Sequence, residues 1–411
     1  MPFCDLCSNI PWDELPTVPP DLSGNLTGHK YIQPLLRWPP GVRGYEHHQS
    51  LDALRQSALS CGLCSLICSS ANNVQKQLEE LKPKWEAKEA IQYEWPTFKL
   101  FVVKRREGGD GCWVMSFVDG DGERTKRREK RNVEEAWIIA ALGLCVRDGK
   151  LSLLPSTQLE PQHADFAGDP LEEVIKGRPV EDRADSSKAF GRSRKWLNEC
   201  DEHPTCKPPQ TILPSRIIDV GTSEDYKVRL WEPVPEGTIG NYVSLSYCWG
   251  NSQEFTTTRA TMEARKAGIT VSDMPTTYQD VVKLTRELGL RYLWVDSLCI
   301  CQDELADWER ESAKMLSIYS NAYLTVAATR AKDSSEGFLG PRIDRTFTEL
   351  DYTRNDLHGK ALAFNLPLRA EHVKRDYINL PDEPLSKRAW SLQERVLSHR
   401  VLIYGSDQMY L

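Results

Sequence analysis

YVSLSYCWG at residues 242–250, followed by LRYLWVDSLCICQDELADWERESAKMLSIYSNAYL at residues 290–324, is the stretch that decides the fold. Residues 243–247 and 292–295 are short β-branched and aromatic runs without a long polar–apolar alternation, a pattern typical of strands covered on both faces. Between them, residues 275–288 carry apolar side chains near helical spacing. A strand, a covering helix and a second strand form a βαβ unit, so we predict a parallel sheet here.

Polar side chains follow both predicted strands at the point where each strand ends. In open sheets of this kind, ligands bind beyond the carboxyl ends of the strands. We therefore predict one binding site at this edge of the sheet. Its predicted substrate contacts are Ser246, Tyr247, Trp249, Ser297 and Gln302, and Asp296 lies among them.

Composition and missing motifs exclude several classes of protein. The net charge of −7 gives no reason to expect nucleic acid as the main partner. The motifs GxGxxG, GxxxxGK[ST] and HExxH are absent, which disfavours a dinucleotide dehydrogenase, a P-loop switch and a metalloprotease. The sequence has neither a run of eighteen apolar residues nor an apolar leader after Met1, so we expect a cytoplasmic protein without a membrane span.

The segments quoted above, together with RAWSLQERVLSHRVLIYG at residues 388–405, resemble the three blocks of the fungal heterokaryon incompatibility (HET) domain. The resemblance covers roughly residues 240–405, and CDLC near the start and PSRIIDVG before the domain resemble the leader of large HET proteins. It implies a role in non-self recognition between fungal individuals, in which an activated HET domain triggers cell death. It also implies a fold similar to that of Toll/interleukin receptor (TIR) domains, some of which hydrolyse NAD.

We therefore expect an α/β protein with a TIR-like (flavodoxin-like), mostly parallel sheet and helices on both faces, preceded by an N-terminal α+β accessory region. The expected domains are residues 1–235 (accessory region), 236–405 (HET domain) and 406–411 (the start of a truncated C-terminal region). Two strands are expected at 400–404 and 408–411, and the second runs to the end of the sequence. In the accessory region we expect a helix at 51–69 and strands at 98–104, 112–118 and 151–154.

The resemblance also implies a catalytic residue. In TIR enzymes a glutamate on a helix near the nucleotide pocket holds the ribose of NAD, and by topology Glu311 is the candidate here, with Asp296 as a second catalytic carboxylate. The structural alternative is that Glu311 forms an ion pair with Arg310 or Lys314. Two functions stay open: an enzyme that takes NAD as its substrate, and a non-enzymatic module that signals through a protein partner or self-assembly.

Twelve cysteines in a reducing compartment favour metal binding or burial over disulfides. Cys4 and Cys7, and Cys61 and Cys64, form two CxxC pairs, the spacing with which two turns close a tetrahedral structural zinc site. His47 or His48 can substitute as a ligand. The alternative is that Cys61, Cys64 and Cys68 only face the buried side of a helix.

Cys200, His203 and Cys206 form a second set of ligand-type residues with the spacing CxxHxxC. A closed zinc site needs a fourth ligand, which this segment does not provide. Packing is therefore the favoured interpretation of this set, and metal binding stays open.

Overall fold

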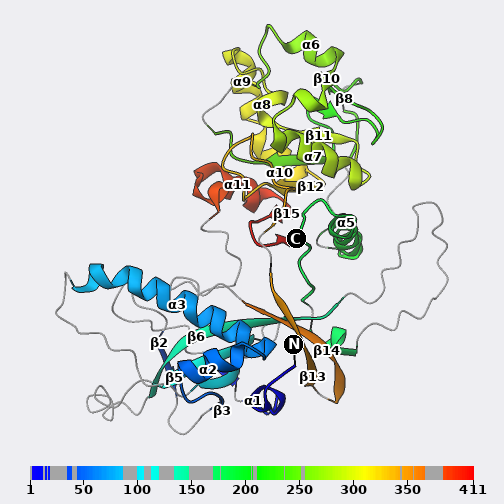
Figure 1. Ribbon diagram of the computed structural model, residues 1–411. Coiled ribbons are helices and arrows are strands. Elements are labelled where there is room, and N and C mark those ends of the chain that lie inside the picture. The colour runs from blue at the N-terminus through cyan, green and yellow to red at the C-terminus, as the bar shows by residue number, and fades with distance from the viewer. Residues whose placement is uncertain are drawn as a thin grey trace. The chain divides into compact units, whose positions relative to one another are not determined.

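The computed structural model of the protein (Figure 1) describes residues 2–12, 14–15, 17–18, 35–38, 44–86, 100–105, 113–119, 134–147, 170–175, 177–204, 206, 211–235, 237–250, 255–342, 345–354, 356–365 and 383–411. The chain divides into two compact units. Unit 1 consists of Met1–Val180 and Arg345–Tyr377, and unit 2 consists of Glu181–Asp344 and Ile378–Leu411.

The sheet of unit 2 has the strand order β10-β8-β7-β11-β9-β12-β15-β16. Its strands are β7 (Ile217–Asp219), β8 (Lys227–Trp231), β9 (Tyr242–Ser246), β10 (Ile269–Thr270), β11 (Tyr292–Trp294), β12 (Leu324–Ala327), β15 (Val401–Tyr404) and β16 (Met409–Tyr410). β11, β9, β12 and β15 pair in parallel, and the pairs toward both edges are antiparallel. The α/β class is confirmed. The sheet is mixed rather than mostly parallel, because the hairpin β7–β8 and two short edge strands extend it.

Helices connect the central strands on both faces. α7 (Thr276–Glu287) leads from β9 to β11, and α10 (Met315–Asn321) leads from β11 across β9 to β12. Since crossovers between parallel strands are right-handed, connections that run in opposite directions place their helices on opposite faces. The parallel strands lie in the order second, first, third, fourth, which is the beginning of a flavodoxin-like order. The TIR-like fold stays a prediction.

The core of unit 2 surrounds β9, whose five residues are all buried. Tyr319 of α10 reaches into this core and donates a hydrogen bond to the Leu245 carbonyl at 3.1 Å. The remaining helices of the unit are α5 (Ser187–Glu202), α6 (Met262–Ala267), α8 (Asp296–Cys299), α9 (Leu305–Ser312), α11 (Ala389–Leu397) and the 3-10 helices η4 (Val271–Asp273) and η7 (Pro384–Lys387). α5 begins where the Ser186 hydroxyl accepts the Ala189 amide hydrogen at 3.1 Å, as an N-cap does.

Unit 1 is built on a second sheet with the order β1-β4-β5-β6-β14-β13, with β2 paired to β6 and β3 to β4. Its strands are β1 (Thr17–Val18), β2 (Leu35–Trp38), β3 (Tyr45–Glu46), β4 (Leu100–Arg105), β5 (Trp113–Asp119), β6 (Glu134–Cys145), β13 (Phe347–Arg354) and β14 (Leu357–Asn365). Its helices are α1 (Asp5–Ser8), α2 (Leu51–Ala58), α3 (Gly62–Glu86) and the 3-10 helix η3 (Pro170–Glu173).

The predicted elements of unit 1 are largely present. The helix expected at 51–69 is two helices, α2 and α3, and the strands expected at 98–104 and 112–118 are β4 and β5. The strand expected at 151–154 lies outside the described residues. No helix in the described part of the chain combines the length and apolarity needed to cross a membrane.

Two segments do not follow the expected domain boundaries. The hairpin β7–β8 precedes residue 236, yet it belongs to unit 2 because β7 pairs with β11. The hairpin β13–β14 lies within residues 236–405, yet it belongs to unit 1 because β14 pairs with β6. The strands expected at 400–404 and 408–411 are β15 and β16, which pair with each other in unit 2.

Asp219 on β7 joins three elements of unit 2 through its carboxylate. Arg291 donates two hydrogen bonds to it at 2.9 and 3.0 Å, Arg229 donates two at 3.0 and 3.3 Å, and the Gly221 amide donates one at 3.1 Å. Burial by itself would raise the pKa of Asp219, but these hydrogen bonds hold the pKa below its ordinary value.

We expect Asp219→Asn to lower the free energy of unfolding by about 1–3 kcal/mol at neutral pH, because charge-assisted hydrogen bonds are lost. A lowered folded-state pKa contributes stability above the unfolded-state pKa of about 4 and loses it as pH falls through the folded-state value. The difference between variant and wild type should therefore shrink below about pH 4. Chemical denaturation across this pH range measures it, with the exposed Glu224→Gln as control. A difference that is independent of pH would contradict this role.

Candidate functional site

After β9 the chain adds β11 on one side of β9 and then crosses back to add β12 on its other side. The carboxyl ends of β9 and β12 lie at this reversal of strand order. Open α/β sheets bind their ligands at such a point. Ser246 ends β9 and lines a hollow together with Thr325, Thr329, Ser391 and Arg395. Residues from β9, the region of β12 and α11 therefore meet at one place.

Glu394 of α11 reaches the end of β9, where its carboxylate accepts a hydrogen bond from the Ser246 hydroxyl. Burial and, to a smaller extent, the negative charge of Asp296 raise the pKa of Glu394 to about 7, although Ser246 and Arg388 oppose the shift. A carboxyl group that titrates near neutral pH can both accept and donate a proton. This is the property required of a general acid or base.

Asp296 begins α8 and lies beside Trp249. Its carboxylate accepts hydrogen bonds from Trp249 Nε1 at 2.9 Å and from the Ser297 amide at 2.7 Å. Burial raises the pKa of Asp296, and these two donors partly offset the shift. Gly250, which follows Trp249, has φ of +78° and room for no side chain, since a Cβ would lie 2.3 Å from Asp333 Cβ.

Tyr247 and Ser297 lie in a closed ring of hydroxyl groups. Tyr247 Oη is 2.8 Å from Tyr278 Oη and 3.0 Å from Ser297 Oγ, and Tyr278 Oη is 2.8 Å from Ser297 Oγ. All three side chains are buried. Gln302 is also held internally, because its amide donates to the Asp296 and Ile300 carbonyls at 3.2 and 3.0 Å. These contacts fix the shape of the strand-end region.

Glu311 lies in a different group of charges. Its carboxylate accepts hydrogen bonds from Ser215 at 2.6 Å, Lys314 at 3.1 Å and Arg310 at 3.2 Å. Burial tends to raise the pKa of Glu311, but these partners lower it below the ordinary value. Among the described residues, no contact joins Glu311 to Ser246 or Asp296. The geometry matches the alternative of an ion pair with Arg310 and Lys314, and the hydrogen bond from Ser215 holds α9 to the segment before β7. Catalysis by Glu311 stays a prediction.

Three residues of the strand-end region were not assigned to it from the sequence: Arg388 and Glu394 in the segment 388–405, and Tyr278 on α7. Glu394 provides the carboxyl group at Ser246, and Arg388 donates to the Tyr247 carbonyl, although neither residue was predicted to belong to the site. Tyr278 was not singled out. The available signal was the charged residues within the otherwise apolar RAWSLQERVL segment, because a charge among apolar helical positions needs a partner when it is buried.

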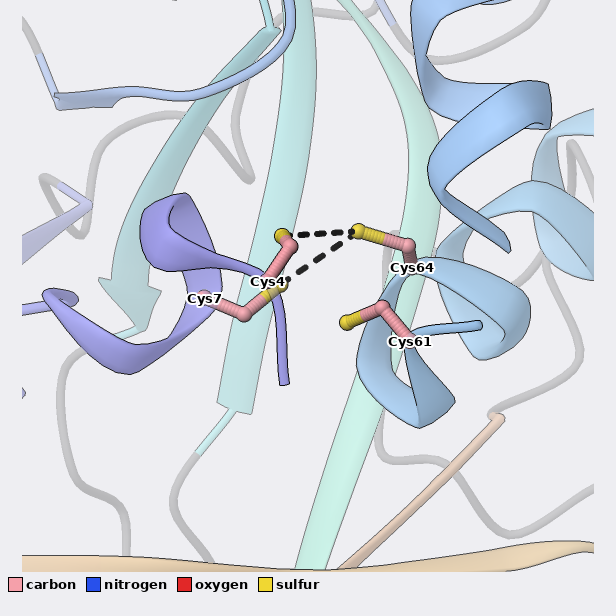
Figure 2. Close-up of side chains that lie close together, drawn as sticks. All are labelled: Cys4, Cys7, Cys61 and Cys64. Carbon is pink, nitrogen blue, oxygen red and sulfur yellow. Dashed lines mark hydrogen bonds between the residues drawn. The ribbon is translucent and has the colours of Figure 1, made fainter. Parts of the chain in front are cut away.

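A cluster of metal-ligating side chains lies in unit 1 (Figure 2). Cys4 and Cys7 of the α1 region face Cys61 and Cys64 at the start of α3, and the four sulfur atoms lie within 4.8 Å of one another. Cys64 Sγ is 3.6 Å from Cys4 Sγ and 3.4 Å from Cys7 Sγ. The structure thus brings the four predicted ligands together in an arrangement that could hold a metal ion.

Two histidines border the cysteine cluster. His47 Nε2 lies 3.2 Å from Cys7 Sγ, and His48 Nε2 lies 3.2 Å from Cys64 Sγ. Cys4, His47, His48 and Cys64 form a second set whose ligand atoms are all within 4.8 Å of one another. Burial lowers the pKa of His47 to about 4, so its ring is neutral at physiological pH, the form that binds metals.

Cys200, His203 and Cys206 also converge, with ligand atoms within 4.8 Å of one another. Arg400 lies against this group, donates to the Cys206 carbonyl at 2.9 Å and forms an ion pair with Asp201 at 2.8 Å. In the described part of the chain this set has three members, one fewer than a closed zinc site requires. Its metal binding stays open.

Glu394 makes the stability of the protein depend on pH. Its folded-state pKa of about 7 exceeds the ordinary value of 4.5, so the unfolded state releases its proton first as pH rises. Stability should therefore fall between about pH 4.5 and pH 7, by about 1–3 kcal/mol, and then level off. In Glu394→Gln this component should be absent, whereas the exposed Glu309→Gln should keep it. Urea denaturation from pH 4 to pH 8.5 measures it, and an unchanged pH slope in Glu394→Gln would contradict the assignment.

Comparison with known proteins places part of the chain in a family. A search of curated proteins and a search of solved structures each returned no match. The family model described as Heterokaryon incompatibility protein (HET) matches residues 242–394. This segment begins at β9 and ends at Glu394, so it contains both partners of the Ser246–Glu394 hydrogen bond. Residues 242–394 of this protein are therefore a heterokaryon incompatibility (HET) domain.

Proposed function

We propose that this protein is a cytoplasmic effector of fungal heterokaryon incompatibility, and that its HET domain triggers cell death by hydrolysing NAD. One observation carries the proposal. Glu394, with a pKa raised to about 7, is hydrogen-bonded to Ser246 and feels the charge of Asp296 at the carboxyl ends of the central strands. The strand order of the sheet supports the TIR-like fold that accompanies this proposal.

Hydrolysis of NAD breaks the bond between the ribose carbon and the nicotinamide nitrogen. The bonding electron pair leaves with nicotinamide, so positive charge develops on the ribose. A carboxylate next to the ribose stabilises this charge more strongly in the transition state than in the ground state. We assign this role to Asp296. Water then adds to the ribose carbon, and the Glu394 carboxylate takes the proton that the water releases.

Two of the expected substrate contacts remain available to a ligand. Ser246 is buried but lines the hollow at the end of β9, and Trp249 is half-buried, so its ring can stack on a base of the dinucleotide. The other expected contacts, Tyr247, Ser297 and Gln302, shape the site through their internal hydrogen bonds.

The test compares two carboxylates in matched variants. Glu394→Gln keeps the shape and removes the charge, and we expect it to lower the rate of NAD loss by about 100-fold or more. Glu311→Gln removes an acceptor of Lys314 and Arg310, and we expect a lower melting temperature with NAD hydrolysis retained in the folded protein. Nicotinamide release is measured at high protein concentration, because assembly can be required for activity.

The reverse pattern, with NAD hydrolysis lost in a stably folded Glu311→Gln and kept in Glu394→Gln, would return the catalytic role to Glu311. Wild-type protein that kills fungal cells while leaving NAD intact would rule out the enzymatic mechanism.

An assembly module is the second candidate function, and one observation favours it. Helices α9, α10 and α11 carry large apolar side chains that are between 48% and 74% exposed. They are Leu305, Trp308, Leu316, Trp390, Leu392 and Val396. α10 and α11 lie against each other, and exposed apolar side chains on neighbouring elements mark sites of protein association.

If this surface mediates assembly, Leu392→Glu should reduce self-association and cell death together, because a charge opposes burial of the interface. Leu59→Glu is the matched control, since Leu59 is an exposed leucine of unit 1. Light scattering and a fungal viability assay measure the two effects. Cell death that persists without assembly would exclude this function.

We also propose that the cysteine cluster binds zinc. The Cys64 sulfur lies 3.4 and 3.6 Å from two neighbouring sulfurs, close to the roughly 3.8 Å that separates thiolates at the corners of a tetrahedral zinc site. Zinc would tie α1 to α3, and its binding energy would stabilise unit 1 directly.

We expect zinc in the purified protein, and we expect Cys61→Ser to lower both its zinc content and the thermal stability of unit 1. Cys68→Ser is the control, because Cys68 is buried on α3 but lies outside the cluster. Elemental analysis and limited proteolysis of unit 1 measure these effects. Metal-free protein of unchanged stability would show that the cysteines only pack.

A further inference from the structure

The cluster in unit 1 contains more metal ligands than one zinc ion uses. Four thiols and two imidazoles gather there, whereas a structural zinc site has four protein ligands. The six side chains are Cys4, Cys7, His47, His48, Cys61 and Cys64. A single zinc bound by the cysteines leaves the presence of both imidazole rings beside them unexplained.

The six side chains divide into two sets of four. One set is Cys4, Cys7, Cys61 and Cys64, and the other is Cys4, His47, His48 and Cys64. The sets have two members in common, Cys4 and Cys64. Two tetrahedra that share an edge have six corners, two of which belong to both, so the ligand count fits two metal ions bridged by two thiolates.

Contacts within the cluster join the two sets. Cys64 Sγ lies 3.6 Å from Cys4 Sγ, 3.4 Å from Cys7 Sγ and 3.2 Å from His48 Nε2. It therefore touches members of both sets, as a bridging ligand must. Cys7 Sγ and His47 Nε2, which belong to different sets, are 3.2 Å apart, so the two ligand sets lie directly against each other.

His47 provides an independent indication. Its side chain is only 5% exposed, and its Nδ1 atom is buried with no hydrogen-bond partner among the described residues. A buried polar atom without a partner costs free energy unless something unseen satisfies it. Among the described residues, Cys7 is the partner of Nε2, and the burial of Nδ1 is left without a hydrogen bond to compensate it.

Charge also favours two ions over one. Cys7, Cys61 and Cys64 are at most 2% exposed, and Cys4 and His48 are half-buried, so most of the cluster is shielded from solvent. Four thiolates around one divalent ion leave a net charge of −2, which is costly to bury. Four thiolates and two neutral imidazoles around two divalent ions form a neutral cluster.

We propose that unit 1 binds two zinc ions in one six-ligand cluster, in which the thiolates of Cys64 and Cys4 bridge the ions, Cys7 and Cys61 complete one tetrahedron, and His47 and His48 complete the other. This inference rests on the proposed zinc site and extends it. The cluster joins α1, the segment after β3 and the start of α3.

The first experiment counts metal in the full-length chain. Protein purified under reducing conditions with zinc present should contain two zinc ions per chain. The double variant His47→Ala/His48→Ala should contain one, whereas His358→Ala, at an exposed histidine of unit 1, should contain two. One zinc in the wild type would overturn the two-ion cluster and leave the single-zinc site standing. No zinc would overturn both.

A second experiment uses only the wild type, so it does not depend on whether the variants fold. Zinc is replaced by cadmium-113, and the full-length protein is studied by NMR. Two cadmium resonances that are coupled to each other are expected, because a bridging thiolate links the two nuclei. A single cadmium resonance, or two uncoupled ones, would overturn the bridged arrangement.

Discussion

The central strand β9 is the constraint on which unit 2 depends. It pairs in parallel with β11 on one side and β12 on the other, and all five of its residues are buried. A strand covered on both faces can present chemistry only at its ends, so the residues after Leu245 are the first that can carry polar function. The right-handed connections then place helices on both faces and leave the carboxyl edge free for Ser246.

Burial also raises the pKa values of two carboxyl groups at the end of β9. Asp296 and Glu394 come from segments far apart in the sequence, and each is removed from much of the solvent by the elements packed around it. Desolvation raises the pKa of both carboxyl groups, and the charge of Asp296 adds to the shift of Glu394. By contrast, Glu311 is surrounded by cations, which lower its pKa. A carboxyl group that titrates near neutral pH, such as Glu394, is suited to proton transfer, whereas a carboxyl group with a lowered pKa, such as Glu311, is suited to holding the fold.

In unit 1, the main constraint is how the short helix α1 is held in place. Its core lies against a sheet of largely antiparallel strands, and the short helix α1 has little apolar surface of its own. The cysteine and histidine cluster fastens α1 to the start of α3. The hairpin β13–β14 completes the sheet of this unit, although it lies within the segment that matches the HET family model. The accessory unit is therefore built partly from the sequence of the HET domain.

The sequence by itself determined the local elements and the types of ligand. The apolar runs at β9 and β11, the helical spacing of α7 and the CxxC pairs were visible because they depend on neighbouring residues. Tertiary structure alone decided which distant groups meet. No local pattern pairs Glu394 with Ser246 or assigns β13–β14 to unit 1, because these outcomes depend on strand order and on the direction of each crossover. The cysteine and histidine cluster lies between these cases. The CxxC spacing predicted its cysteine ligands, but only the fold brings both histidines to the same place.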